Sequence, residues 1–402
     1  MNRPPSDSVF DAVVVGRGAV GAAVALGLAQ SGLRTAVVAP ADAAPADDGW
    51  DPRVFALSPA TRTLLGRLRA WDAMDAARIA PVYDMRVYPD ARSGAPELHF
   101  GAYEACLDAL AWIVEGRNLQ SALDQALGFC GAVRVDARVD AVDNAGPGPA
   151  TLSLDDGTEL RARLVVGADG AHSPLRDMIG LEARERDYPQ HAVVANFETE
   201  HPHRDCAYQW FGAHGILALL PLPGQRCSIV WSAPVPLAGS LVELDPQALA
   251  DRVSETSLGT LGQLRCITPA QVFPLRLVEV PKTVAPRVVL VGDAAHQVHP
   301  LSGQGMNLGM GDVGALLDVV AAREPFRDLG DPLLLRRYER ARAQAVATMR
   351  FTTDGLQRLF DPDLEPALPA LVRPLVGARE LGWRLVASSQ WLKRRLIAHA
   401  AS

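Results

Sequence analysis

The stretch "FDAVVVGRGAVGAAVALGLAQSGLRTAVVAP", Phe10–Pro40, decides the fold. Its apolar run Val13–Val15 is stopped by a glycine, which predicts a short buried strand. Small and apolar residues from Ala22 to Gln30 predict a helix, and Gly32 stands where a helix commonly ends in the left-handed conformation. Arg34–Ala39 predicts a second strand. This order of elements indicates an α/β protein.

The turn between the first strand and the helix carries G-x-G-x-x-G at Gly16, Gly18 and Gly21. The first glycine permits the tight turn, the second lets a pyrophosphate approach the backbone, and the third lets the helix lie close to the sheet. The helix N-terminus then faces the anion. Because the motif lies between a strand and a helix within about thirty residues, it predicts a dinucleotide site rather than a plain glycine-rich turn.

The end of the second strand departs from that pattern. Such sites usually have an acid about 20 residues further on, which binds the ribose hydroxyls. This chain has Ala39–Pro40 there, and Asp42 is near but out of register. We therefore expect the adenosine end to be held in another way, or less tightly.

Two later apolar runs also end in a glycine turn, and each of these two turns contains an acidic residue. Leu164–Val166 leads into Gly167–Gly170, which contains Asp169, and "VVLVGDAAH" from Val288 leads into Asp293. In open α/β sheets, ligands bind beyond the carboxyl ends of the strands. We expect both carboxylates at that edge, where they can accept hydrogen bonds from sugar-type hydroxyls.

The segment after Asp293 has little side chain between its backbone and a ligand. Pro300, Gly303 and Gly305 lie in this loop, and a helix is predicted from about Gly305. Its N–H groups would face the ligand, which suits a ring that becomes anionic, as a reduced flavin does.

Three Ser-Pro or Asp-Pro pairs predict where other helices begin, because Ser and Asp cap helices and Pro fits the first helical position. They are Ser58–Pro59, Ser173–Pro174 and Asp245–Pro246.

In combination these motifs resemble the class A flavoprotein monooxygenases. That family has an N-terminal G-x-G-x-x-G, a central Asp-Gly motif and a late Gly-Asp motif, and this chain has all three in order. Within the class, "DPRVFALSPATRTLLGRLRAWDAM" (Asp51–Met74) and "GDAAHQVHPLSGQGMNLGMGD" (Gly292–Asp312) resemble the ubiquinone-biosynthesis hydroxylases. The resemblance covers nearly the whole chain.

The resemblance implies an FAD site built by residues from three parts of the chain. Its three motif glycines would face the pyrophosphate, and Arg53 would lie near the isoalloxazine edge. Arg117 would reach the phosphate and sugar region, with Gln120 one turn further on. Asp169 and Gly170 would support both FAD and NAD(P)H. Asp293 would hold the ribityl chain. The positions expected along the flavin, near where oxygen reacts, are Pro300, Gly303, Gly305 and Asn307.

Simpler interpretations of several residues stay open. Arg53 fits a surface arginine near a helix start, and Asp169 fits a turn former because Asp-Gly is common in turns. Arg117 fits a helix-start residue paired with Glu115. His296 and His299 are spaced like metal ligands, but a third ligand is missing nearby, so we predict no metal site.

The sequence predicts two β-rich segments and a helical last part of the chain. We expect a discontinuous Rossmann-like FAD-binding domain (1–80, 102–185 and 282–350), an inserted β-rich substrate domain (81–101 and 186–281) and a C-terminal helical region (351–402). The clearest hairpin turns at Pro223-Gly224. Its large side chains fit either the floor of an apolar pocket or a plain sheet core: Tyr208, Trp210, Phe211, Leu217, Leu219 and Leu220.

Composition restricts the partners and the location. The chain has 402 residues and a net charge of −7, so the basic excess of a nucleic-acid binder is absent. Five scattered cysteines without a C-x-x-C pair argue against a disulfide scaffold. No signal peptide opens the chain, and no apolar run reaches the ~18 residues of a membrane span. We expect a cytoplasmic protein. The tail "ELGWRLVASSQWLKRRLIAHAAS" fits either a packed helix or peripheral contact with the inner membrane.

The function that the resemblance implies is hydroxylation of a prenylated phenolic precursor of ubiquinone. NAD(P)H would reduce FAD, and O2 would react to give a C4a-hydroperoxyflavin that transfers the hydroxyl group. Other ubiquinone-biosynthesis proteins are expected partners. Two alternatives stay open: a hydroxylase of a small soluble aromatic acid, and a non-catalytic family member in a biosynthetic assembly. The residues assign no catalytic base.

Overall fold

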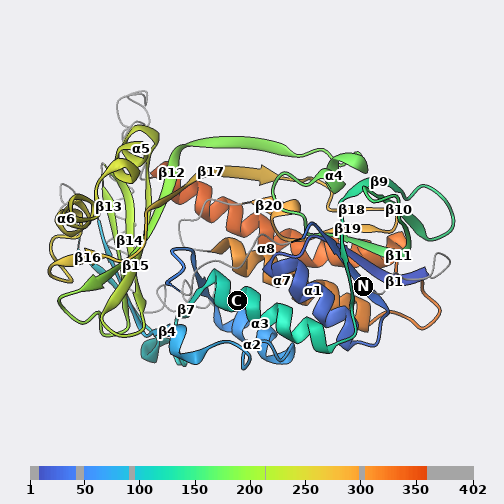
Figure 1. Cartoon of the computed structure of the whole chain (residues 1–402), viewed down its shortest axis with the longest axis horizontal. Helices are drawn as coiled ribbons and strands as arrows, with labels where there is room; N and C mark the ends of the chain where they lie inside the picture. The colour runs from blue at the N-terminus through green and yellow to red at the C-terminus, as the bar shows by residue number, and fades with distance from the viewer. Residues whose placement is uncertain (1–8, 42–48, 90–95, 213, 298–303, 360–402) are drawn as a thin grey trace.

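The computed structural model describes residues 9–41, 49–89, 96–212, 214–297 and 304–359, with side chains through residue 349. Within these residues the strands form an eight-stranded, a nine-stranded and a three-stranded sheet. The eight-stranded sheet and its helices lie at one end of the molecule, and the nine-stranded sheet lies at the other (Figure 1). We call them the first sheet and the second sheet.

The first sheet has a parallel centre that contains the predicted strands. β1 pairs in parallel with β2 on one side and with β11 on the other. Its parallel strands, in spatial order, are β8 (Val133–Asp136), β2 (Thr35–Ala39), β1 (Val9–Val15), β11 (Glu159–Gly167) and β19 (Val288–Leu290). Its antiparallel strands are β9 (Val139–Asp143), β10 (Ala150–Leu154) and β18 (Val284–Ala285).

Both faces of the parallel centre are buried, which explains its continuous apolar runs. One face, with Val14, Val37 and Leu164, packs beneath long helices. The other face, with Val13 and Val165, packs beside the β9–β10 hairpin. The helices on the first face are α1 (Ala19–Gln30), α2 (Pro59–Arg67), α3 (Gly116–Phe129), α7 (Gln304–Ala321) and α8 (Pro332–Leu359).

The second sheet is largely antiparallel, and the long strand β12 (Arg184–Thr199) runs from it back toward the first sheet (Figure 1). Its other strands are β5 (Asp84–Tyr88), β6 (Leu98–Gly101), β13 (Cys206–Gly212), β14 (Gly215–Leu222), β15 (Arg226–Pro234), β16 (Leu264–Cys266), β17 (Gln271–Glu279) and β20 (His296–Gln297). Helices α5 (Val235–Glu243) and α6 (Pro246–Thr256) cover its outer face (Figure 1).

The predicted hairpin is β14–β15, with Gly224 at its turn in the left-handed region, at φ 77°. The pocket-floor interpretation is wrong for four of its expected side chains. Three of them pack in the core beneath α5 and α6, and the fourth, Tyr208, packs against it: Trp210, Leu217, Leu219 and Tyr208. Phe211 and Leu220 have the opposite parity along their strands, so they lie on the face turned away from those helices.

The three-stranded sheet lies between the two large sheets. It consists of β3 (Val54–Leu57), β7 (Ala111–Glu115) and β4 (Ile79–Val82). Val54 and Ala56 of β3 share an apolar cluster with Leu220 of the second sheet. The short helical elements are α4 (Pro174–Met178), η1 (Ala76–Arg78), η2 (Tyr103–Ala105) and η3 (Gly292–Ala294).

The three predicted helix starts are confirmed, because each cap makes its hydrogen bond. Ser58 Oγ accepts from Thr61 N at 3.2 Å, at the start of α2. Ser173 Oγ accepts from Arg176 N at 3.0 Å, and Asp245 Oδ1 accepts from Ala248 N at 2.9 Å.

Candidate functional site

Two of the three motif glycines are required by close packing of the backbone. Gly16 has φ 102°, and a Cβ there would overlap the carbonyl oxygen of Ala168. A Cβ on Gly21 would overlap the carbonyl oxygen of Gly16. The Gly-x-Gly turn therefore lies directly against the Asp-Gly segment, and α1 lies directly against the turn.

Gly18 differs from them, because a Cβ there would meet no atom within 4 Å. Gly18 is the N-cap of α1, whose first turn has neither a side-chain cap nor an acidic residue. The first N–H groups of a helix lack partners within it and attract anions. Open space in front of this helix end fits a pyrophosphate.

The turn itself is held by α3. Gln120 Nε2 donates to the carbonyl oxygen of Arg17 at 3.0 Å. The Arg17 side chain is buried and lies 3.7 Å from Asp136 Oδ1. Gln120 thus supports the loop that would bind the pyrophosphate, whereas its expected contact with the cofactor itself stays a prediction.

The two predicted arginines are brought together by an acid that the sequence analysis did not single out. Asp51 Oδ1 accepts from Arg53 N at 2.9 Å, and Asp51 Oδ2 accepts from Arg117 N at 3.0 Å. Gly116 N also donates to the Arg53 carbonyl oxygen at 2.8 Å. The spacing of Asp51-Pro52-Arg53 could have indicated the first of these contacts, because an Asp side chain often accepts a hydrogen bond from the backbone N–H two residues further along the chain.

A second acid, Glu115, which the sequence offered as a partner for Arg117, supports this arrangement. It is 1% exposed and accepts from Arg78 Nε at 2.5 Å, Arg78 Nη2 at 2.8 Å and Asp51 N at 2.6 Å. The cation that pairs with Glu115 in these contacts is Arg78, from another part of the chain.

Asp293 lies just after β19, in the turn η3, and its side chain is open to solvent. Desolvation by the surrounding protein nevertheless raises its pKa, and the charges of His296 and Arg53 offset part of that effect. A carboxylate that contacts solvent and is still surrounded by protein lies in a recess. The charge of Arg53 acts on this carboxylate, as expected if both predicted residues face the same site.

The turn that carries Asp293 is fixed by the inaccessible carboxylate of Asp312. Its Oδ2 accepts from Gly292 N at 2.9 Å and lies 2.7 Å from His296 Nε2, and its Oδ1 accepts from Arg342 Nε at 2.7 Å. Burial opposes ionisation of Asp312, but His296 and Arg342 outweigh it and lower its pKa. His296 therefore has a structural partner.

Of the four positions expected along the flavin, two are described. Asn307 Oδ1 accepts from Ser58 N at 2.9 Å and Thr61 Oγ1 at 2.8 Å, and its Nδ2 donates to Ala56 O at 2.8 Å. Its amide thus joins α7 to β3 and α2. Gly305 has open space in front of it. Pro300 and Gly303 lie outside the described residues, as do His299 and Asp42.

Asp169 of the Asp-Gly motif is engaged within the protein. Its Oδ1 accepts from Ser173 Oγ at 2.5 Å, and its Oδ2 accepts from Leu175 N at 3.0 Å. Burial raises its pKa, and these hydrogen bonds partly oppose the rise. Gly170 follows at φ 89°, in the left-handed region. The carboxylate stabilises the start of α4, which agrees with the turn-former interpretation.

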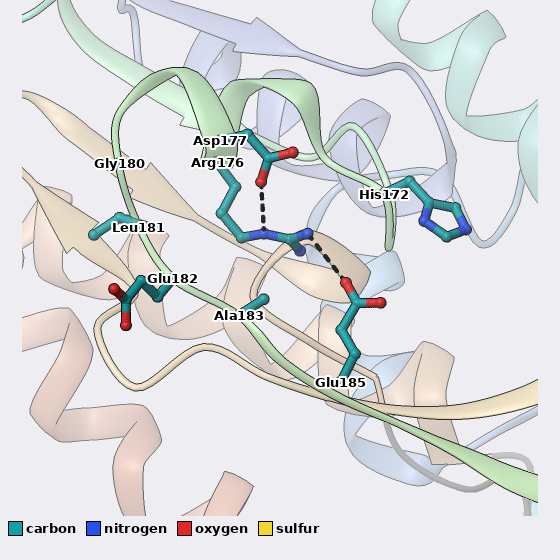
Figure 2. A pocket seen from close by; sticks show the side chains of 8 residues that line it. All are labelled: His172, Arg176, Asp177, Gly180, Leu181, Glu182, Ala183 and Glu185. Atoms are coloured by element: carbon teal, nitrogen blue, oxygen red, sulfur yellow. Dashed lines mark ion pairs between the residues drawn. The ribbon is translucent and has the colours of Figure 1, made fainter.

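Arg176 links the Asp-Gly and Gly-Asp motifs, and sequence reasoning missed it. Its buried Nη1 donates to Ala171 O at 2.9 Å and to Ala294 O at 3.3 Å. Figure 2 shows its guanidinium between Asp177 and Glu185, in a pocket that Glu182 also lines. Three carboxylates make this pocket unsuitable for an apolar ligand.

The described residues fit the middle of FAD, from the pyrophosphate to the ribityl chain. An open helix N-terminus lies at the Gly-x-Gly turn, and a recessed acid lies just after β19. Both lie at the carboxyl edge of one parallel sheet, where such folds bind ligands. Fold and site define an α/β dinucleotide-binding protein.

Comparison with known proteins identifies the family. The chain matches the FAD binding domain family over residues 9–352 and belongs to it. It is 36% identical over 400 residues to ubiquinone hydroxylase UbiL of Rhodospirillum rubrum, covering 98% of this chain and 90% of the relative. It is 35% identical to 3-demethoxyubiquinol 3-hydroxylase of Escherichia coli, covering 96% and 97%. The fold matches PqsL, a probable FAD-dependent monooxygenase from Pseudomonas aeruginosa, with TM-score 0.75, 21% identity and coverage of 94% and 100%.

The expected FAD-binding flavoprotein monooxygenase is therefore confirmed as the class of this enzyme. Among the described residues, no helix is long and apolar enough to cross a membrane. The same part of the chain holds no cluster of three or more His, Cys, Asp or Glu side chains suited to a metal ion.

Proposed function

We propose that this enzyme hydroxylates a prenylated phenolic precursor of ubiquinone, using FAD, NAD(P)H and O2. The observation that carries the proposal is the similarity, over nearly the full length, to two hydroxylases that act on ubiquinone-type molecules. The site geometry supports it, because the three family motifs meet at one edge of the first sheet.

Bound FAD would supply the redox chemistry, namely reduction by NAD(P)H and activation of O2. In our proposal the backbone at Gly18 and the N-terminus of α1 bind its pyrophosphate. Asp293 binds the ribityl hydroxyls, and Arg53 lies beside the isoalloxazine edge. Arg117 reaches the phosphate and sugar region, while Asp51 holds both arginines in place.

The substrate is proposed to lie against the inner face of the second sheet. The outer face is filled by the core beneath α5 and α6, so only the alternate residues remain for a ligand. On this inner face Ala218 and Val230 are registered neighbours and only partly buried. The face contacts β3 through Leu220. We propose a domain division with the FAD domain in 1–80, 102–185 and 282–350, the substrate domain in 81–101 and 186–281, and a C-terminal helical region in 351–402.

We further propose that the enzyme is cytoplasmic and works at the inner-membrane surface with other ubiquinone-biosynthesis proteins. A prenyl chain partitions into a bilayer, so its ring is most accessible there. The basic tail that contains Trp383 and Lys393 is the proposed contact, and it lies outside the described residues.

The test is turnover by the purified full chain. FAD should bind and colour the protein, and a prenylated phenol should accelerate NAD(P)H oxidation with matching hydroxylated product. The matched comparison is a soluble aromatic acid of the same ring pattern without the prenyl chain. Faster coupled turnover of the soluble acid would favour the alternative hydroxylase. Absence of product from every precursor, despite bound FAD, would favour a non-catalytic member.

A further inference from the structure

The adenosine end of the proposed FAD site lacks the acid that such sites usually have. β2 ends at Ala39, whose methyl group cannot bind a ribose hydroxyl. The neighbouring parallel strand β8 ends at Asp136, which is the cross-strand partner of Ala39. Neighbouring strands lie about 4.8 Å apart, and registered residues project from the same face. The carboxylate of Asp136 therefore starts one strand spacing from the missing acid, at the same edge of the sheet.

Asp136 is also tied to the turn that would bind the pyrophosphate. Arg17 stands between the first two motif glycines, and its Nη1 lies 3.7 Å from Asp136 Oδ1. The Arg17 side chain is 5% exposed, whereas that of Asp136 is 45% exposed. Arg134 Nε donates to the same oxygen at 2.8 Å. Two cations thus orient a carboxylate that a ligand at this edge can still reach.

We propose that Asp136, positioned by Arg17, accepts hydrogen bonds from the ribose hydroxyls of the adenosine half of FAD. Asp136 would replace the acid that is absent from the end of β2. A carboxylate is suited to this because it only accepts hydrogen bonds and ribose hydroxyls donate them. The inference rests on the proposed FAD-binding function. The competing explanation is that Asp136 only neutralises the buried Arg17.

The experiment compares two probes on the full-length apoprotein: ADP, and 2′,3′-dideoxy-ADP, which lacks both hydroxyls. Each displaces FAD, and displacement is followed by flavin fluorescence. Wild type should bind ADP about tenfold more tightly than the dideoxy compound, as for a hydrogen bond to a charged group. Asp136→Ala should lose that preference while binding the dideoxy compound as wild type does. The control is Asp140→Ala, which removes an exposed carboxylate from β9 and should keep the preference.

A rescue variant separates ribose binding from charge balance. Adding Ala39→Glu to Asp136→Ala places an acid at the end of β2 and should restore the preference for ADP. Equal losses for both probes in Asp136→Ala would overturn the inference, because charge balance alone would explain them. An unchanged preference in Asp136→Ala would overturn it as well. A wild-type chain that binds no FAD would instead overturn the proposed function.

Discussion

Asp293 is a residue where binding and stability have opposite requirements. Its pKa is raised in the fold, so ionisation destabilises the apoprotein at a pH above the ordinary aspartate value of 3.8. Asp293→Asn should therefore raise the apoprotein melting temperature at pH 7, and the gain should vanish as the pH falls below that value. The same change should weaken FAD binding roughly tenfold or more, if the carboxylate binds the ribityl hydroxyls. Thermal melts across pH and a fluorescence titration measure the two effects.

Two outcomes would contradict this account of Asp293. A lower melting temperature for Asp293→Asn at pH 7 would show that the carboxylate stabilises the empty site. Unchanged FAD affinity would remove its assigned role in binding.

The two aspartates of α7 differ in burial, although each pairs with an arginine. Asp312 is inaccessible and binds Arg342 and His296, whereas Asp318 lies 3.2 Å from Arg67 at the surface. Asp312→Asn should lower the free energy of unfolding by about 3 kcal/mol, because it leaves the largely desolvated guanidinium of Arg342 poorly paired. Asp318→Asn, the matched control, should change it by less than about 1 kcal/mol. Urea unfolding at pH 7 gives both values.

The pH dependence of this difference has a defined sign. The pKa of Asp312 is lowered in the fold, so its stabilisation is present above the ordinary value of 3.8 and is lost as the pH falls through the lowered value. The gap between wild type and Asp312→Asn should close only in strong acid. Equal destabilisation by Asp312→Asn and Asp318→Asn would contradict the argument.

At the scale of one element, the two glycines of the Gly-x-Gly turn have different roles. Gly16 is required for packing, whereas Gly18 is proposed to bind FAD. Gly16→Ala should destabilise the protein strongly, because φ 102° and the Ala168 carbonyl both exclude a side chain. Gly18→Ala should fold within about 1 kcal/mol of wild type, since its φ of −60° suits alanine and the space in front is open. It should nevertheless weaken FAD binding. Thermal melts and FAD titration of both variants test this, and full FAD affinity in Gly18→Ala would contradict it.

The sequence predicted the elements that short-range rules determine. Ser58, Ser173 and Asp245 cap helices as expected, because a cap involves only residues within one turn. The hairpin turn at Gly224 was found for the same reason. The sequence-based prediction did not distinguish the two faces of the neighbouring strand β13, although strict alternation would have placed Trp210 and Phe211 on opposite sides.

The sequence did not predict the contacts that hold the site together. Asp51, Arg176 and Asp312 each join segments far apart in the chain, and their partners become visible only when the strands are in register. Asn307 was expected along the flavin, yet its amide atoms bind β3 and α2. A family motif therefore identifies a residue as important without deciding whether it contacts the cofactor or supports a residue that does.

At the scale of the whole molecule, the second sheet has one face filled by its own core and one face that we propose for the substrate. Val230 lies on the inner face and is partly buried, whereas Val235 lies at the start of α5 and is 41% exposed. Val230→Phe should raise KM for a prenylated phenol several-fold, because it fills space in front of the proposed ring position. Val235→Phe adds the same volume at the exposed start of α5, away from the inner face, and should leave turnover unchanged. FAD affinity should be normal in both, since neither position lies on the first sheet. If Val230→Phe hydroxylates the phenol as wild type does, the substrate must lie elsewhere than against this face.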